Sequence, residues 1–509
     1  MTQFDVQRTI PAIMATQHPD NAHAPYWETD GDGFVSVHEE SKECVSAFQD
    51  LHVQEFMWDW EGKHADAAVI DKLFTEYHEY FKEHQIGKEI FLTFRIPNIW
   101  HEKGYSLLRA LSVILTSEDF AKDLNFHTPP LFEVILPMTE SADQLVHIQN
   151  AYKKFAQFKQ DVLDQQQYTN QEYLRIIPLV EGIESQLEIG TLLRDYIVKH
   201  TQLFNRPPTY IRPFLAASDP ALVGGVVATV LANKIALSEI AKVSKETGIP
   251  MYPIIGVGSL PFRGGLNPEN VDRFIKEYKG VRTVTVQSAF RYDYPKEQVE
   301  AAIQKLKREL PYTDTIIISD EEKNTLINII HKFKTHYQFT LDKILPELEP
   351  FFSLVPKRRE RKLHIGLLGY GRNMGKNTLP RAICFTGACY SLGIPPELIG
   401  SGQALATLTE PEFQLLKKHY ISFEQNMLEA GRYLNKETVN TYIETNKAWQ
   451  FIARDIHDLE HHVHITLGPQ TPAEHIHHNL SANMLLAKGD NTYRQELIIK
   501  TGKIRKSLG

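Results

Sequence analysis

Eight short apolar runs, separated by longer helix-like segments, constrain the fold of this chain more than any other feature. Each run is rich in Ile, Val, Leu, Phe and Tyr and is too short for a helix, so each is predicted to be a buried strand. The runs cover residues 10–15, 53–58, 89–95, 131–137, 174–180, 209–215, 251–257 and 281–287. Helix-like segments such as 66–84 and 221–243 lie between them. Eight repeats of strand, loop and helix predict an α/β fold of the (β/α)8 TIM-barrel type.

Alternatively, fewer than eight of these runs are strands, because short buried strands and buried helical segments have similar sequence patterns. Beyond about residue 300 the pattern changes, and only 363–369 resembles a further strand. Helix-like segments follow at 300–310, 320–350, 410–430, 436–461 and 472–487. We therefore expect a barrel over 1–300 that carries the active site. A mainly helical region over 301–509 is expected to pack on it and to be available to an oligomer interface.

Composition excludes several classes of partner. The chain of 509 residues is 42% hydrophobic, which is typical of a globular protein. Its net charge of −8 gives no general attraction to nucleic acid or anionic membranes. Its cysteines, Cys44, Cys384 and Cys389, have no C-x-x-C spacing, so we expect neither disulfides nor a zinc site. The N-terminus lacks a signal-like apolar segment, and the run at 221–232 is shorter than a membrane span. A soluble cytoplasmic protein is predicted.

Three further segments receive no functional role. The basic run 357–362 is predicted to be a solvated connection, and the histidines within 458–464 and 475–478 are predicted to lie on the surface or at an interface. Residues 369–378 resemble a phosphate loop, but the glycine spacing and the residue after Lys376 differ from a Walker motif, and the dinucleotide glycine pattern fails by one position. A biotin-bearing Met-Lys-Met is absent. No nucleotide or biotin cofactor is therefore expected.

Two acidic residues follow neighbouring predicted strands. Glu181 directly follows 176–180, and Asp219 follows 214–218. Because the carboxyl ends of barrel strands meet at one mouth, both carboxylates are expected to lie there, where they suit Mg²⁺ or Mn²⁺. Asp219 also has an alternative: an Asp followed by Pro220 is typical of a helix N-cap with proline at the first helical position.

Three arginines, Arg95, Arg263 and Arg291, also stand at predicted strand ends. Arg263 lies in a loop that is rich in glycine, with Gly256, Gly258, Gly264 and Gly265. Guanidinium groups and exposed backbone N–H groups of such a loop bind oxyanions, so together they predict a site for a phosphorylated carboxylate. In the alternative interpretation, each arginine pairs with a barrel carboxylate and the glycines only form turns.

His18 completes the predicted site. It is a histidine at the end of a predicted strand, in a His-Pro context. An imidazole titrates near neutral pH and therefore suits proton transfer at the barrel mouth.

Four long motifs carry a family resemblance. They are MATQHPDN at 14–21, WDWEGK at 58–63, GSLPFRGG at 258–265 and QSAFRY at 287–292. Together they resemble the compact, archaeal-type phosphoenolpyruvate carboxylases, which some bacteria also carry, and they extend in one order over the chain. The resemblance implies conversion of phosphoenolpyruvate and bicarbonate to oxaloacetate and phosphate through carboxyphosphate and pyruvate enolate. It also implies Mg²⁺ or Mn²⁺, no organic cofactor, and a homotetramer.

The larger plant and bacterial carboxylases are more distantly similar. Thr16-Gln17-His18-Pro19 resembles their Thr-Ala-His-Pro, and Ser218-Asp219 resembles their metal-binding Ser-Asp. Pro178-Leu179-Val180-Glu181 resembles their Pro-Leu-Phe-Glu. By this likeness His18 is the catalytic histidine, Glu181 and Asp219 are the metal ligands, and Arg263 is the essential arginine. The chain departs from them in lacking a second Arg-Gly-Gly loop and a lysine shortly after Ser218-Asp219, a role for which we name Lys63.

The predicted site is therefore divided among three roles. Catalysis is assigned to His18, Arg263 and Arg291, and metal binding to Glu181 and Asp219. Substrate binding is assigned to Arg95, Gly264, Gly265, Gln287 and Lys63. Two rival functions remain: a phosphotransferase or aldol-type lyase that uses a similar barrel, and a non-enzymatic barrel that only binds anions.

Overall fold

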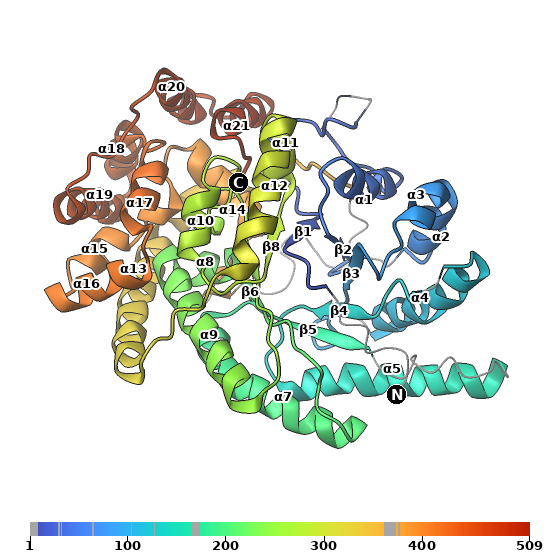
Figure 1. Ribbon diagram of the computed structural model, residues 1–509. Helices are drawn as coiled ribbons and strands as arrows, with labels where there is room; N and C mark the ends of the chain where they lie inside the picture. Colours follow the sequence, from blue (N-terminus) through green and yellow to red (C-terminus); the bar gives the residue numbers. More distant parts are fainter. Residues whose placement is uncertain are drawn as a thin grey trace.

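Eight parallel strands close into a barrel in chain order, β1 to β8 (Figure 1). The computed structural model describes residues 9–28, 31, 33–63, 66–102, 104–126, 128–163, 174–360, 373–374 and 377–509. The strands are β1 Ile13–Thr16, β2 Glu55–Asp59, β3 Phe91–Arg95, β4 Glu133–Leu136, β5 Arg175–Val180, β6 Phe214–Ala216, β7 Ile254–Gly256 and β8 Thr283–Val286. All eight predicted strands are present, and the (β/α)8 barrel is confirmed.

The barrel closes through parallel pairing of β8 with β1, where Val286 lies beside Ala15. Its strands are almost entirely buried, because side chains inside the barrel pack on one another and those outside pack under helices. Met57, Ile135 and Phe214 belong to the apolar cluster formed by barrel strands. Burial on both faces explains why the runs are continuously apolar instead of alternating.

Helices connect consecutive strands. They are α1 Glu40–Gln49, α2 Val69–Glu76, α3 His78–Glu83, α4 Gly104–Asp123, α5 Ala142–Leu163, α6 Ile183–Leu187, α7 Ile189–Phe204, α8 Ser218–Gly224, α9 Val226–Thr247 and α10 Val271–Glu277. After β8 come α11 Ser288–Tyr292 and α12 Lys296–Glu309. The predicted helix 221–243 is divided between α8 and α9 at Gly225. There φ is +83°, and an added Cβ would lie 3.1 Å from the ring of Tyr337.

The remaining chain is mainly helical and lies on one side of the barrel, at the left in Figure 1. It contains α13 Asp320–Phe352, α14 Ala382–Ser391, α15 Ser401–Leu405, α16 Glu410–His419, α17 Phe423–Gly431, α18 Lys436–Thr445, α19 Gln450–Val463, α20 Pro472–Leu486 and α21 Asn491–Arg505. The predicted helix 410–430 is two helices, α16 and α17, and 436–461 is α18 and α19. The predicted strand 363–369 lies outside the described residues. The short strands β9 Asn373–Met374 and β10 Asn377–Thr378 form an antiparallel pair.

Helix α9 joins the two apolar cores. Its first half, including Val227 and Leu231, packs in a core with Ile330 and Leu341 of α13. Its second half, including Ile240, packs in the core around the barrel. Because α9 is buried on nearly every face, the helical region is attached to the barrel through a shared helix.

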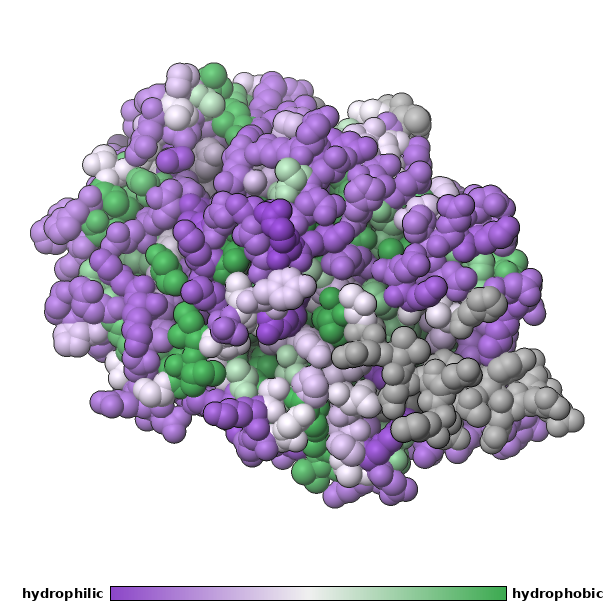
Figure 2. All heavy atoms as spheres, viewed as in Figure 1, coloured by the Kyte–Doolittle hydropathy of each residue, from purple (hydrophilic) through white to green (hydrophobic). Residues whose placement is uncertain are grey.

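The face of the molecule in Figure 2 is mostly hydrophilic, with scattered apolar side chains. Among the described residues, no single helix has the length and apolar character of a membrane span. One pair of segments, Ala382–Ser391 and Pro396–Leu405, meets the criterion only in combination, and it is bent by 95°.

Candidate active site

His18 lies two residues beyond β1, in the loop at the carboxyl end of the barrel. Its Nδ1 lies 2.9 Å from Thr16 Oγ1, a contact that orients the imidazole ring. Its carbonyl oxygen accepts hydrogen bonds from the amides of Asp20 and Ser288, at 3.2 and 3.3 Å. The loop after β1 is thus joined to the start of α11, which follows β8.

Arg95, the last residue of β3, is held by two carboxylates, Asp59 at the end of β2 and Glu61 just after it. Its Nε donates to Asp59 Oδ1 at 2.8 Å, and its Nη2 pairs with Glu61 Oε2 at 2.8 Å. Lys63 Nζ lies 3.5 Å from Asp59 Oδ2 and is buried. Two predicted substrate ligands, Arg95 and Lys63, therefore share one aspartate at the mouth.

Glu102 adds a further carboxyl group near this motif. It accepts hydrogen bonds from the amides of Gly62 and Asn98, at 3.1 and 3.0 Å. Burial raises its pKa to about 7, against the opposing effect of these two amides. Glu102 therefore titrates close to neutral pH beside the loop that carries Lys63.

Arg263 is buried in the short 3-10 helix η1 Pro261–Arg263 after β7, and each of its side-chain nitrogens has a partner. Nη1 donates to Asp20 Oδ2 at 2.9 Å and to the backbone oxygen of Gly509 at 2.6 Å. Nη2 donates to Gln287 Oε1 at 2.5 Å, and Nε donates to Ser218 Oγ at 3.2 Å. The predicted pair Arg263 and Gln287 is therefore in direct contact.

The glycine amides of this loop do not form the predicted oxyanion cradle. The amides of Gly258, Gly264 and Gly265 donate to the carbonyls of Arg263, Pro261 and Leu260, at 2.7 to 3.0 Å. An added Cβ at Gly264 would lie 2.3 Å from Val257 Cγ1, so the glycine permits close packing of the turn. Because these N–H groups are already used, Gly264 and Gly265 can bind a substrate through their amides only if the loop rearranges.

Arg291 lies in α11 and is completely buried. Its Nη2 donates to the carbonyl of Thr16 at 2.7 Å and to Glu43 Oε1 at 3.0 Å. Among the described residues, Nε and Nη1 of Arg291 have no hydrogen-bond partner. A buried N–H group without a partner is costly, and an oxyanion would remove that cost.

The alternative in which each strand-end arginine pairs with a carboxylate agrees with the structure for Arg95, Arg263 and Arg291. Such pairing does not exclude ligand binding, because a guanidinium group has five N–H donors.

The prediction of a solvated connection at 357–362 is wrong for Arg358 and Arg359, while residues 361 and 362 lie outside the described residues. Arg358 and Arg359 are 9% and 4% exposed. Arg359 contacts Glu43 and donates to the carbonyl of Gln17 at 3.0 Å, so Glu43 is shared by Arg359 and Arg291. Arg358 donates to the carbonyls of Asn21 and Ala22. The two arginines therefore hydrogen-bond to the backbone of the loop after β1.

Glu181 and Asp219 follow the neighbouring strands β5 and β6, as predicted, and both are partly exposed. Glu181 Oε2 accepts the amide of Met138, which follows β4, at 2.7 Å. Asp219 is the second residue of α8, whose N-cap position is Ala217, so the helix-cap interpretation of Asp219 is wrong. No group of three or more His, Cys, Asp or Glu side chains within the described ranges is arranged for a metal ion.

Comparison with known proteins agrees with the motifs at this mouth. The family profile described as "Phosphoenolpyruvate carboxylase" matches residues 10–509. The chain belongs to the phosphoenolpyruvate carboxylase family. It is 42% identical to the phosphoenolpyruvate carboxylase of Oenococcus oeni and 43% identical to that of Leuconostoc mesenteroides, each over 99% of both chains. It is 37% identical to that of Metallosphaera sedula, over 99% of this chain and 100% of the relative.

Several residues at this mouth of the carboxylase fold were not singled out from the sequence. Asp20 and Ser218 lie inside recognisable motifs, and their position at strand ends was the available signal. Glu43 lies on α1, and Gly509 lies 246 residues from the arginine it contacts. Only tertiary contacts identify those two.

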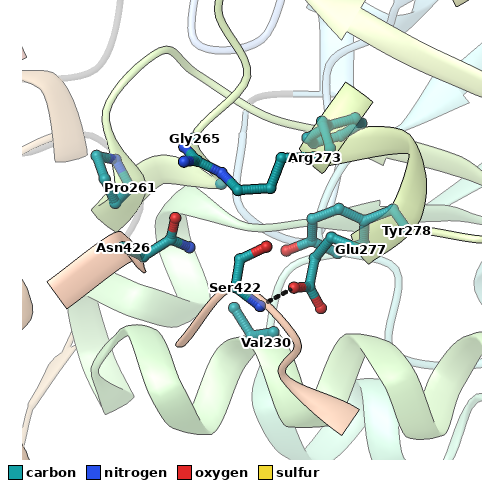
Figure 3. A pocket seen from close by; sticks show the side chains of 10 residues that line it. Val230, Pro261, Gly265, Arg273, Glu277, Tyr278, Ser422 and Asn426 are labelled. Atoms are coloured by element: carbon teal, nitrogen blue, oxygen red, sulfur yellow. Dashed lines mark hydrogen bonds between the residues drawn. The ribbon is translucent and has the colours of Figure 1, made fainter. Parts of the chain in front are cut away.

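A small cavity lies behind the Arg263 loop of this family member (Figure 3). Pro261, Gly264 and Gly265 line one side of it. On another side Ser422 donates its amide to Glu277 Oε2 at 2.7 Å, the dashed contact in Figure 3. Its volume is about 10 Å³, close to one water molecule. A phosphorylated carboxylate cannot bind there, so the barrel mouth remains the candidate site.

Proposed function

We propose that this protein converts phosphoenolpyruvate and bicarbonate to oxaloacetate and phosphate, an anaplerotic carbon-fixing reaction, as a carboxy-lyase. The full-length match to the family carries the proposal. The arginine pairs, the carboxylates and His18 at one barrel mouth support it, because this reaction needs cationic groups for two anions and a base for one proton.

Glu181 and Asp219 are proposed to hold Mg²⁺ or Mn²⁺. Their chemistry fits, because these cations accept a few carboxylate oxygens and keep other positions for water and substrate. When bound, the ion would supply positive charge to the phosphate and enolate oxygens. No protein cage of three ligands is needed for that role.

The arginines are proposed to bind the phosphate and carboxylate of phosphoenolpyruvate. Arg291 is the strongest candidate, because it is buried and two of its nitrogens have no partner among the described residues. Arg95, Lys63, Gln287 and Arg263 are proposed to complete the ligand shell. Gly264 and Gly265 join it only after movement of the loop, for which the loop's glycines provide conformational freedom.

His18 is proposed to act after the first step. Bicarbonate oxygen attacks phosphorus, the bond from phosphorus to the enolate oxygen breaks, and carboxyphosphate forms beside the enolate. His18 then takes the proton of carboxyphosphate, the bond from carbon to the bridging oxygen breaks, and carbon dioxide and phosphate result. The enolate carbon attacks carbon dioxide, and His18 returns its proton to phosphate. Buried side chains around the mouth exclude water, which would otherwise protonate the enolate to pyruvate.

The testing experiment is a turnover assay of the full chain with phosphoenolpyruvate, bicarbonate and Mg²⁺, coupled to malate dehydrogenase. We expect oxaloacetate formation that needs bicarbonate and metal, needs no nucleotide, and is unaffected by avidin. Nucleotide dependence would indicate a phosphotransferase, and bicarbonate independence an aldol-type lyase. Binding of phosphoenolpyruvate without turnover would indicate a non-enzymatic anion-binding barrel.

We also propose that the protein is a cytoplasmic homotetramer without nucleic-acid or membrane partners. Light scattering coupled to size-exclusion chromatography tests the assembly. A mass near 234 kDa is expected, four times the chain mass of 58.4 kDa. A monomer mass would contradict it.

A further inference from the structure

We propose that Glu397, in the 3-10 helix η3 Pro396–Leu398 of the helical region, is a positioning residue for Arg263. Its carboxylate Oε1 accepts the amide of Phe262, the residue before Arg263, at 2.7 Å. The proposal rests on the proposed function, in which Arg263 acts on the substrate.

The amide of Phe262 is used differently from its neighbours in the loop. The amides of residues 263–266 all donate to carbonyl oxygens of residues 258–261 within the same loop. Phe262 instead donates to a side chain 135 residues away. Glu397 therefore provides a backbone anchor from outside the turn that carries Arg263.

The ring of Phe262 is anchored in the same region. Phe262 is fully buried, and its ring centroid lies 5.7 Å from Phe385 of α14 and 6.4 Å from Tyr337 of α13. Both the amide and the side chain of Phe262 are thus fixed by the helical region. A displacement of η3 relative to the barrel would displace Arg263 from Asp20 and Gln287.

A carboxylate is an expensive acceptor at this position. Glu397 is 1% exposed, its Oε1 also accepts the hydroxyl of Tyr390 at 2.6 Å, and its Oε2 has no hydrogen-bond partner in the described part of the chain. Both donors are neutral, so they do not offset the carboxylate's loss of water as the cation of an ion pair would. Burial raises the pKa of Glu397 to about 7, which agrees with this cost. An apolar residue would fill the space without this desolvation cost, but it would remove the hydrogen bonds from Phe262 and Tyr390.

Two substitutions of Glu397 separate the effect of its hydrogen bond to Phe262 from the effect of its charge. Glu397→Gln keeps an acceptor for Phe262 and places its NH₂ group where Oε2 has no partner, so kcat should stay within about threefold of wild type. Glu397→Leu removes the acceptor, and kcat for oxaloacetate formation should fall at least about tenfold. In the double variant Glu397→Leu with Arg263→Lys, the two losses should combine to less than their product, because both act through Arg263.

The matched control is Asp455→Leu on α19. Asp455 is another buried carboxylate of the helical region. It accepts the amides of Gly400 and Gln403 at 2.8 and 2.9 Å, in the segment directly after η3, whereas the Phe262 amide is held by Glu397. Its loss should lower the Tm, while kcat stays well above that of Glu397→Leu because Phe262 keeps its acceptor. If Glu397→Leu does not fold, Glu397→Asp replaces it. This variant keeps the carboxyl group but shortens its reach, and the same fall in kcat is expected.

The inference is overturned if folded Glu397→Leu, or Glu397→Asp in its place, keeps wild-type kcat while Arg263→Lys loses activity. It is also overturned if the two losses multiply in the double variant, or if Asp455→Leu lowers kcat as much as Glu397→Leu does. Failure of the proposed function gives a different result, since the wild-type protein would then form no oxaloacetate. Full activity in Arg263→Lys would instead show that Arg263 has no role in the reaction.

Discussion

The loops after β7 and β8 each carry a buried arginine, and the two arginines are held in different ways. Arg263 has a partner on every side-chain nitrogen: Asp20, Gln287, Ser218 and the carbonyl of Gly509. Arg291 is bonded through Nη2 alone, while its Nε and Nη1 have no partner among the described residues.

The comparison suggests a division of work between two neighbouring loops. An arginine with unpartnered donors can donate to an oxyanion without first losing a contact, so in the proposed mechanism Arg291 is expected to contribute mainly to ground-state binding. Arg263 must exchange at least one existing hydrogen bond before it can contact a substrate. Its contribution is therefore expected in a later, closed state of the loop and in kcat more than in KM.

Substitution of Arg291 should have the largest effect. Arg291→Lys retains the charge but loses the planar set of donors, so kcat/KM for phosphoenolpyruvate should fall on the order of 100-fold, mainly through KM. Arg273→Lys is the control, because Arg273 forms a two-point ion pair with Glu429 outside the site. The control should stay within about twofold. Unchanged KM in Arg291→Lys would remove the distinction between the two loops.

Arg263→Lys should have a smaller effect with a different signature. We expect kcat to fall about tenfold and KM to change less than about threefold, because existing contacts of Arg263 limit its part in the first binding event. Steady-state kinetics over a range of phosphoenolpyruvate concentrations measures both values. A rise in KM equal to that of Arg291→Lys would mean that both arginines bind the ground state.

Substitution of Asp219, the residue after Ser218, tests the proposed metal site. Asp219→Asn removes the negative charge of a proposed metal ligand, so the Mg²⁺ concentration for half-maximal activity should rise about tenfold. Asp219 lies in the first turn of α8 but is not its N-cap, so the substitution removes no helix cap. The Tm without metal should change little. Asp272→Asn serves as the control, because Asp272 is an exposed residue of α10 that pairs with Lys305. Wild-type metal dependence in Asp219→Asn would refute its assignment as a ligand.

Asp455 should affect stability but hardly activity. Burial raises its pKa to about 7, against the lowering effect of two backbone amides. The folded protein therefore holds this proton where the unfolded chain has lost it. The associated stability is present below about pH 4 and is lost as pH rises to about 7, on the order of a few kcal/mol. Urea unfolding at pH 5 and pH 8 should show a smaller decline for Asp455→Asn than for wild type. Equal declines would contradict the raised pKa.

Much of the fold could be predicted because burial leaves a local pattern. The eight strands are buried on both faces and therefore read as continuous apolar runs. Helix α14 was missed since its sequence, AICFTGACYS, is buried nearly all round and has no amphipathic period. The break between α8 and α9 depends on the backbone of Gly225 and its neighbour Tyr337, which the local sequence does not report.

The candidate site could be predicted where it follows strand ends, as at His18, Arg95 and Glu181. It could not be predicted where partners are distant in sequence. Glu43 and Arg359 are 316 residues apart, so the sequence around 357–362 does not show that Arg359 has a buried acidic partner. Its local charge pattern alone therefore predicted a solvated segment. The glycine amides after β7 were also misjudged, because hydrogen bonding within a turn depends on its closure and not on its glycine content.

The central claim is that the mouth lined by His18 and these arginines carries out stepwise carboxylation. It is tested most directly by measuring phosphate release and oxaloacetate formation on one sample of His18→Asn. We predict that oxaloacetate formation stops while some bicarbonate-dependent phosphate release continues, with pyruvate as the other product, because His18 acts on carboxyphosphate. Equal loss of both activities would place His18 in binding or in the first step. Full retention of both would contradict the account by removing His18 from the mechanism.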